Sequence, residues 1–248
     1  MNALEVLRRE ADLLAVSAIG QPPHKGVPAC PGLNLGETVR HVGSGYRIAL
    51  AWIRLGREPK PGEWQEYPEQ GQDALGFMQS GAEAVIAELT AHDEDEPCAT
   101  WWPVQQNYGF WRRRLAHETT VHRMDVQGAA GAEAEAVSDE VAIDGVDEVL
   151  TLWLGHKLDV LGVRGSRDSL VAVQVEDHLW LTRCGPRGAS AWRVVDPEDA
   201  HVADAQVTAS PMTMYRWLWG RLPDRLVDVV GDHDAIAQLW ALLRLATK

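Results

Sequence analysis

The residue types with the clearest chemistry lie between Arg114 and Asp125, in the run Arg-Leu-Ala-His-Glu-Thr-Thr-Val-His-Arg-Met-Asp. Glu118 and His122 are four residues apart, which is about 40° around an α-helix, so both fall on one face. A carboxylate and an imidazole one turn apart can share a divalent metal ion if a third ligand comes from another helix. The spacing therefore predicts a metal-binding face on this helix, although Glu/His pairs at this spacing are also common on protein surfaces.

His117 and Glu118 look like the start of a zinc-peptidase motif, but the spacing differs. In His-Glu-x-x-His two residues separate the glutamate from the second histidine, whereas three separate Glu118 from His122. His117 is also five residues from His122, roughly 140° away on a helix. We therefore expect His117 to be packed and hydrogen-bonded, or to support the ligands, and not to bind the metal.

The best candidate for the third ligand is His41, which lies in a second expected helix. Gly43 and Gly45 follow it, and each weakens a helix by up to ~1 kcal/mol relative to alanine. Glycines there suggest close approach by another helix or by a ligand, although loose packing would also permit them. A lone helical histidine is usually structural. With Glu118 and His122, however, His41 would leave one or two metal positions open, as a catalytic metal requires.

Three further groups of charged residues have two readings each. Asp125 could bind metal, but we favour a hydrogen bond to a ligating imidazole or an ion pair with Arg123 or Arg114. The basic run 112–114 is either a solvated helix start or a contact for an anionic substrate. Gly231–Asp234 looks metal-like by composition, and is more simply a helix N-cap followed by first-turn acids.

The elements that would carry these residues fall into two groups by periodicity. Helical spacing of apolar residues predicts five helices in the first ~160 residues, at positions 2–19, 34–55, 70–91, 109–127 and 138–159. Alternating apolar and polar residues then predict strands and two helices, with strands at 170–175, 178–184, 191–195, 201–209 and 226–230 and helices at 211–220 and 232–246. This pattern predicts a helical bundle of residues 1–162 and a small α+β domain of residues 163–248.

The composition of the chain excludes several classes of partner. Its 248 residues carry a formal net charge of −13, so binding to nucleic acid or to an anionic membrane surface is not expected. No apolar run approaches the ~18–20 residues that span a bilayer, and Met1–Glu10 lacks the apolar core of a signal peptide. The three cysteines form no Cys-x-x-Cys and favour reduced structural thiols. We expect a cytoplasmic protein.

The segments 111–125, 38–42 and 214–223 together resemble the signatures of the mycothiol-dependent maleylpyruvate isomerase family. The resemblance covers essentially the whole chain. It implies a DinB-like four-helix metal-binding bundle followed by an α+β domain similar to sterol carrier proteins. It also implies an actinobacterial cytoplasm and mycothiol as the thiol cosubstrate. The zinc ligands of the family match His41, Glu118 and His122, and a carboxy-terminal arginine near the active site matches Arg221 best and Arg216 less well.

The resemblance leaves several functions open. We expect a zinc- and mycothiol-dependent enzyme in which a metal-bound thiolate attacks a small electrophilic substrate, and we favour thiol S-transfer over cis-trans isomerisation of maleylpyruvate. Arg221 would pair with a carboxylate of the substrate or of the thiol. One alternative is a non-catalytic protein that binds metal or a small ligand. A metal-dependent hydrolase ranks last, because no free general base is evident beside the metal.

Overall fold

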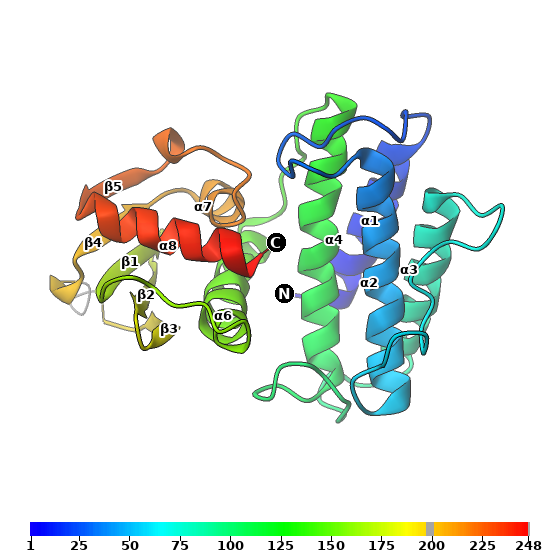
Figure 1. Cartoon of the computed structure of the whole chain (residues 1–248), viewed down its shortest axis with the longest axis horizontal. Helices are drawn as coiled ribbons and strands as arrows, with labels where there is room; N and C mark the ends of the chain where they lie inside the picture. The colour runs from blue at the N-terminus through cyan, green and yellow to red at the C-terminus, as the bar shows by residue number, and fades with distance from the viewer. Residues whose placement is uncertain (197–200, 248) are drawn as a thin grey trace. The chain divides into compact units, whose positions relative to one another are not determined.

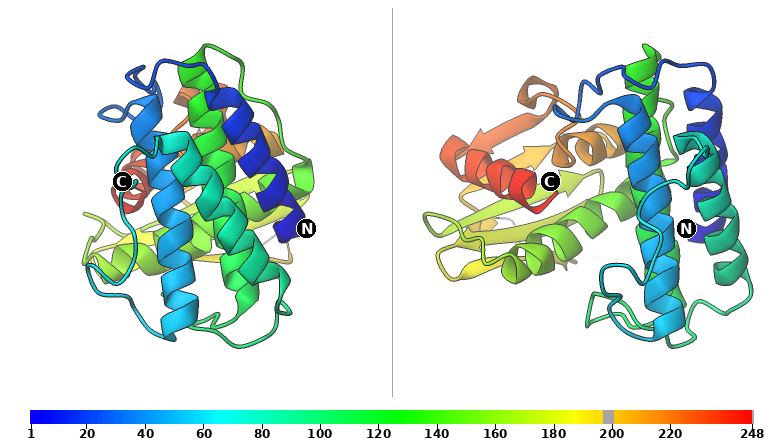
Figure 2. Two further views of the ribbon diagram at one scale, coloured as in Figure 1. Left: turned by 90° about the vertical axis from the view of Figure 1, so that its right-hand side faces the viewer. Right: turned by 45° about the vertical axis from the view of Figure 1, so that its right-hand side comes forward.

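The computed structural model describes residues 1–196 and 201–247, which form two compact units. The first unit, Asn2–Glu135, is a bundle of four long helices. Figures 1 and 2 show these helices side by side, and α2 packs against both α3 and α4. Their bounds are α1 (Ala3–Ala18), α2 (Leu35–Leu55), α3 (Ala74–Thr90) and α4 (Tyr108–Ala130).

Side-chain caps explain where the bundle helices begin. Asn34 and Glu37 form a complete capping box at the start of α2, and the Asn107 side chain accepts a hydrogen bond at the start of α4. The third helix starts at Ala74, later than expected, because the Asp73 side chain caps it. The fourth continues beyond residue 127 and ends at Gly131, whose left-handed conformation favours glycine.

The second unit consists of Met1 and Ala136–Lys248, and its described residues form a sheet covered by helices. Its helical elements are α5 (Asp139–Glu148), the π-helical segment η1 (Val149–Lys157), α6 (Leu158–Val160), α7 (Pro211–Leu218), the short 3-10 turn η3 (Asp224–Leu226) and α8 (His233–Ala246). Its strands are β1 (Ser169–Val175), β2 (His178–Gly185), β3 (Gly188–Val194), β4 (Ala205–Thr208) and β5 (Asp228–Gly231).

The five strands form one sheet in the order β3-β2-β1-β4-β5. The pairing of β1 with β4 is parallel and the other three pairings are antiparallel. The hairpin register places Val173 opposite Trp180, and both side chains are fully buried. Helix α8 packs on β1, β2 and β4, and η1 packs on β3 and on α8. The predicted combination of a four-helix bundle with a small α+β region is confirmed.

The compact units divide at residues 135 and 136, whereas the domain boundary predicted from sequence lies at 162 and 163. The difference concerns the helical segment 139–160, which packs against α7, α8 and β3 of the second unit. Periodicity identifies such a segment as helical but does not say which core its apolar face joins. Among the described helices, none is both long enough and apolar enough to cross a membrane.

Candidate metal centre

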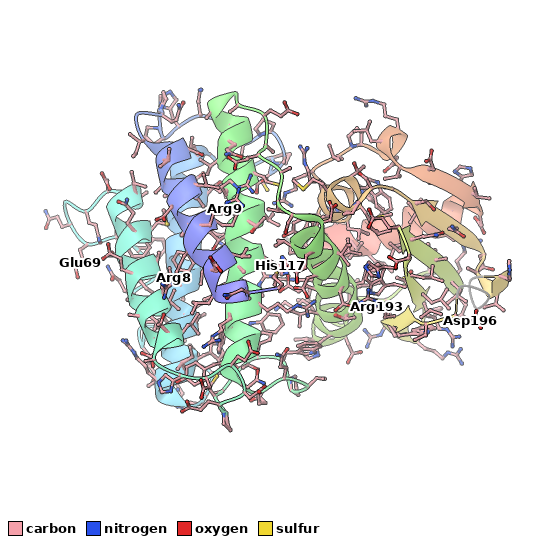
Figure 3. The ribbon with its side chains drawn as sticks, turned by 180° about the vertical axis from the view of Figure 1, so that it is seen from behind. Arg8, Arg9, Glu69, His117, Arg193 and Asp196 are labelled. Atoms are coloured by element: carbon pink, nitrogen blue, oxygen red, sulfur yellow. The ribbon has the colours of Figure 1, made fainter. Side chains whose placement is uncertain are left out.

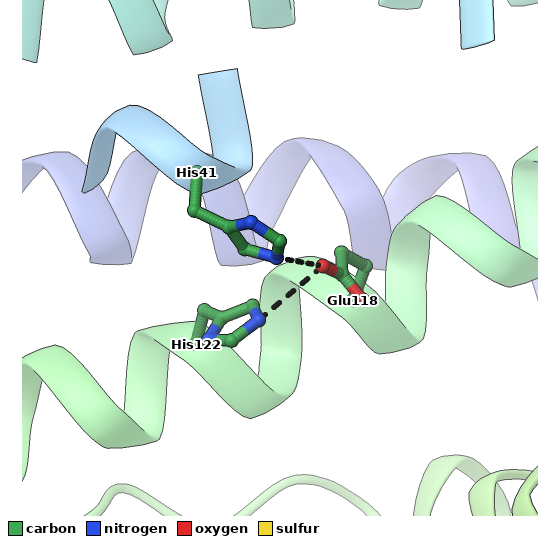
Figure 4. Close-up of side chains that lie close together, drawn as sticks. All are labelled: His41, Glu118 and His122. Carbon is green, nitrogen blue, oxygen red and sulfur yellow. Dashed lines mark hydrogen bonds and ion pairs between the residues drawn. The ribbon is translucent and has the colours of Figure 1, made fainter. Parts of the chain in front are cut away.

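His41, Glu118 and His122 converge on one point of the bundle. Figure 4 shows His41 on α2 and the other two residues on α4, with both imidazoles directed at the same carboxylate oxygen. His41 Nε2 lies 3.0 Å from Glu118 Oε1, and His122 Nε2 lies 3.3 Å from the same atom. One donor atom from each residue lies within 4.8 Å of the other two. The structure therefore brings together the three residues that spacing and resemblance select.

The second oxygen of Glu118 is held by Arg114, one turn earlier on α4. The Arg114 guanidinium donates to Glu118 Oε2 and is almost fully buried. Burial alone would raise the pKa of Glu118. The charges of Arg114 and His122, with hydrogen bonds from both histidines, hold that pKa well below its usual range. Glu118 is thus ionised at neutral pH, and only its Oε1 faces the histidines.

The other ring nitrogen of His122 is held by Asp125. His122 Nδ1 lies 3.0 Å from Asp125 Oδ2, and the same oxygen accepts a hydrogen bond from Cys30 Sγ at 3.6 Å. Burial lowers the pKa of His122, but Glu118 and the hydrogen bond to Asp125 outweigh it and raise that pKa to about 9. A carboxylate on Nδ1 leaves Nε2 as the ligating nitrogen and is the usual partner of a metal-binding histidine.

Contacts between helices hold α2 in place beside α4. Thr119 Oγ1 donates to the Leu115 carbonyl, so Tyr46 donates its hydroxyl to Thr119 Oγ1 at 2.7 Å. This bond joins the two ligand-bearing helices next to Glu118. On the face of α2 that meets α3, Gly43 lets the helix approach Phe77 and Met78, since a Cβ at Gly43 would lie 2.9 Å from Met78 Cα. His41 is thereby fixed relative to the two ligands on α4.

The donor set fits a divalent cation. Two imidazole nitrogens and one carboxylate oxygen are the ligands of many catalytic zinc sites. They also suit nickel, iron or manganese. Both ligands on α4 have a partner on their second polar atom, as metal-binding side chains usually do. The His41 side chain is 50% exposed, so one side of the cluster is accessible to solvent and to small molecules.

The remaining candidate residues lie outside the cluster. His117, labelled in Figure 3, is fully buried on α4 and is not part of the ligand group. Asp232 caps α8 by accepting hydrogen bonds from the amides of Asp234 and Ala235, as the simpler reading of that segment predicts. Arg221 lies shortly after α7 in the second unit, beyond Trp219 and Gly220, and its guanidinium donates to the Trp219 carbonyl. Its role in a reaction stays a prediction.

One interpretation of the basic run 112–114 is a solvated helix start, and it is wrong for two of the three arginines. Arg112 donates to the carbonyls of Leu89 and His92, and Arg114 is buried against Glu118. The four-residue separation of Arg114 and Glu118 is a common ion-pair spacing in helices, so the sequence contained this signal. The contact of Cys30 with Asp125 had no such signal, because Cys30 lies in a loop 95 residues away.

Comparison with known families identifies the bundle. The family described as "Mycothiol maleylpyruvate isomerase N-terminal domain" matches residues 4–127, which is half of the 248 residues. The chain belongs to the mycothiol maleylpyruvate isomerase family. The match spans all four bundle helices almost completely and includes the three residues of the candidate centre. The family predicted from the sequence motifs is confirmed.

Solved structures show the same fold over most of the chain. A crystal structure of the mycothiol-dependent maleylpyruvate isomerase superposes with a TM-score of 0.60 at 13% identity, covering 93% of this chain and 92% of that one. A histidine-to-alanine mutant of that isomerase gives a TM-score of 0.60 at 12% identity, with the same coverage. No curated relative matches the sequence. At these identities the likeness concerns the fold.

Proposed function

We propose that this family member is a mycothiol-dependent enzyme that joins the thiol to a small electrophilic substrate, with a divalent metal, zinc by resemblance, held by His41, Glu118 and His122. The convergence of their three donor atoms within 4.8 Å supports this most strongly. When bound there, a divalent cation supplies a positive charge that favours the thiolate form of a thiol. The thiolate is the reactive nucleophile.

The surrounding residues of the chain orient this centre. Arg114 occupies Glu118 Oε2, so Glu118 offers a single oxygen and occupies one ligand position. Asp125 occupies His122 Nδ1, so the ring cannot flip without losing a buried hydrogen bond. His41 forms the solvent-accessible side, where a thiol and an electrophile can enter. We further propose that Arg221 pairs with a carboxylate of the substrate or of the thiol.

The cellular setting is also part of the proposal. None of the three cysteines of the chain forms a disulfide, which suits a reducing compartment. We place the activity in the cytoplasm of a mycothiol-producing, actinobacterial cell, as the family resemblance implies. The partners are then a small-molecule thiol and a small electrophile, with no role for nucleic acid or a membrane.

The first experiment measures metal and thiol chemistry together. Protein purified without chelators is analysed for metals and incubated with mycothiol and candidate electrophiles, and conjugates are detected by mass spectrometry. We expect about one equivalent of metal per chain, and a loss of both metal and conjugate in His41→Ala. His24→Ala is the matched control, because His24 is an exposed histidine of the same unit outside the cluster. Wild-type protein that holds no metal, and gains neither thiol binding nor turnover when metal is added, contradicts the proposal.

The second candidate function is cis-trans isomerisation of maleylpyruvate, the substrate named for the isomerase with the matching fold. In that reaction the thiolate adds to a double bond, the bond rotates, and the thiol leaves again, so no conjugate accumulates. Turnover of maleylpyruvate without a stable thioether product favours this alternative. Full turnover by a metal-free His41→Ala variant would instead exclude a metal-dependent reaction of either kind and favour a binding role for the cluster.

A further inference from the structure

Two glycines that lie two residues apart on α2 have different surroundings. A Cβ at Gly43 would lie 2.7 Å from the Phe77 ring and 2.9 Å from Met78 Cα, so close packing of α2 on α3 requires glycine there. A Cβ at Gly45 would meet no heavy atom within 4 Å, and Gly45 is not among the glycines with positive φ. Neither packing nor backbone conformation therefore requires glycine at position 45, although glycine weakens the helix.

Gly45 lies beside the candidate metal centre. It follows His41 by four residues and therefore lies on the same face of α2, about 40° round and one turn along the helix. His41 directs its ring at Glu118 and His122 of α4 (Figure 4). The missing side chain at position 45 thus leaves space open next to the ligand cluster, on its accessible side.

The same face of α2 continues with apolar side chains. Ile48 and Trp52 follow Gly45 at helical spacing, and all three residues are partly exposed. The Trp52 ring lies 6.5 Å, between centroids, from that of Trp111, which is seven residues before Glu118 on α4. Beyond His41 this face carries no charged side chain as far as Trp52. This face of α2 therefore suits an apolar substituent of a substrate better than a carboxylate.

We propose that Gly45 determines substrate specificity by keeping space open for an apolar, ring-sized part of the electrophile, which lies against Ile48 and Trp52. This inference rests on the proposed thiol-conjugating function and narrows its substrate class. It favours electrophiles with an aromatic or similarly bulky apolar substituent over a small dicarboxylate, and hence S-transfer over isomerisation.

The test compares two thioether conjugates of one thiol, in which the group on sulfur is either a small alkyl group or an aromatic ring. S-methyl-mycothiol and S-(2,4-dinitrophenyl)-mycothiol are titrated into metal-loaded protein by calorimetry. We expect wild type to bind the aryl conjugate about tenfold or more tightly than the methyl conjugate, since the ring buries additional apolar surface. Gly45→Val should lose this preference and Gly45→Ala should reduce it. Gly128→Val should keep it, because Gly128 is another helical glycine where an added Cβ would meet no heavy atom within 4 Å.

The outcomes separate this inference from the function on which it rests. Wild type that binds both conjugates equally, or Gly45→Val that keeps the full preference, overturns the role of Gly45 while leaving the thiol chemistry intact. Loss of metal from folded Gly45→Ala also overturns it, because the glycine would then serve the metal. Metal-loaded wild type that binds neither conjugate contradicts the proposed function itself, and the inference falls with it.

Discussion

Helix α4 carries two groups of buried charged residues, and they differ in how their polar atoms are used. In the first, Arg123 Nε donates to Glu10 Oε2 at 2.8 Å, and Arg123 Nη1 donates to Gln127 Oε1 and to the Glu135 carbonyl. The side chains of Arg123 and Glu10 are 0% and 2% exposed. This group links α1, α4 and the segment after α4, and it is closed to solvent.

In the second group, around Glu118, three donor atoms converge on one point and one ligand side chain is half exposed. Both groups satisfy buried charge with an oppositely charged partner, as buried ions require. Burial of charge alone therefore does not mark a functional site on this helix. Convergence of donor atoms, together with access from solvent, distinguishes the Glu118 group from the structural Arg123 group.

The largest effect on stability is expected from a substitution in the solvent-excluded Arg123 group. Arg123→Met leaves Glu10 buried without its partner and should lower the free energy of unfolding by about 3–5 kcal/mol, as measured by urea denaturation. Metal affinity of the folded variant should not change. Arg9→Ala is the control, since it removes an exposed ion pair with Glu135 and should cost about 1 kcal/mol or less. Equal losses in the two variants would show that the buried pair does not stabilise the bundle as argued.

A smaller loss of stability, which depends on metal, is expected from a substitution in the solvent-accessible Glu118 group. Arg114→Gln removes the charge that faces Glu118 Oε2, but both histidines still contact Oε1. The metal-free variant should lose about 1–3 kcal/mol in urea denaturation. Excess zinc should recover more of this loss than it recovers for Arg123→Met, because a cation at the cluster also neutralises Glu118. Identical responses of the two variants to zinc would erase the distinction between the groups.

The next effect concerns metal affinity and not the fold. Asp125→Asn replaces the carboxylate on His122 Nδ1 with a neutral amide and should weaken metal binding about 10- to 100-fold. Competition with a chromogenic chelator measures this change. Asp12→Asn, on the exposed side of α1, should leave the affinity unaltered. If Asp125→Asn binds metal as tightly as wild type, the hydrogen bond at 3.0 Å does not orient the ligand.

Much of the fold and of the candidate centre was predictable from local patterns. The spacing of Glu118 and His122 placed both on one helix face, and the cap at Asn34 placed His41 on another helix. The long-range contacts of the Arg123 group and the Glu118 group were not predictable in this way. Glu10 meets Arg123 across 113 residues, and Cys30 meets Asp125 across 95. Such pairings depend on how helices pack, which periodicity within one helix does not encode.

The last prediction, with the smallest expected effect, compares the pKa of a titratable group that has no countercharge with that of Glu118, which has one. Cys184 is fully buried, and burial raises the pKa of its thiol to about 12, whereas Arg114 and the histidines hold the pKa of the partly buried Glu118 low. At pH 8 only roughly one Cys184 in ten thousand is then a thiolate.

In a Cys30→Ser, Cys98→Ser variant, iodoacetamide should label the native protein very slowly at pH 8 and the urea-unfolded protein rapidly. The native rate should rise as the pH is raised toward 10, because the thiolate fraction grows. Mass spectrometry measures the labelling. Rapid labelling of the native protein at pH 8 would show that the fold does not shield Cys184. It would contradict the argument that burial without a countercharge keeps this group neutral, in contrast to Glu118.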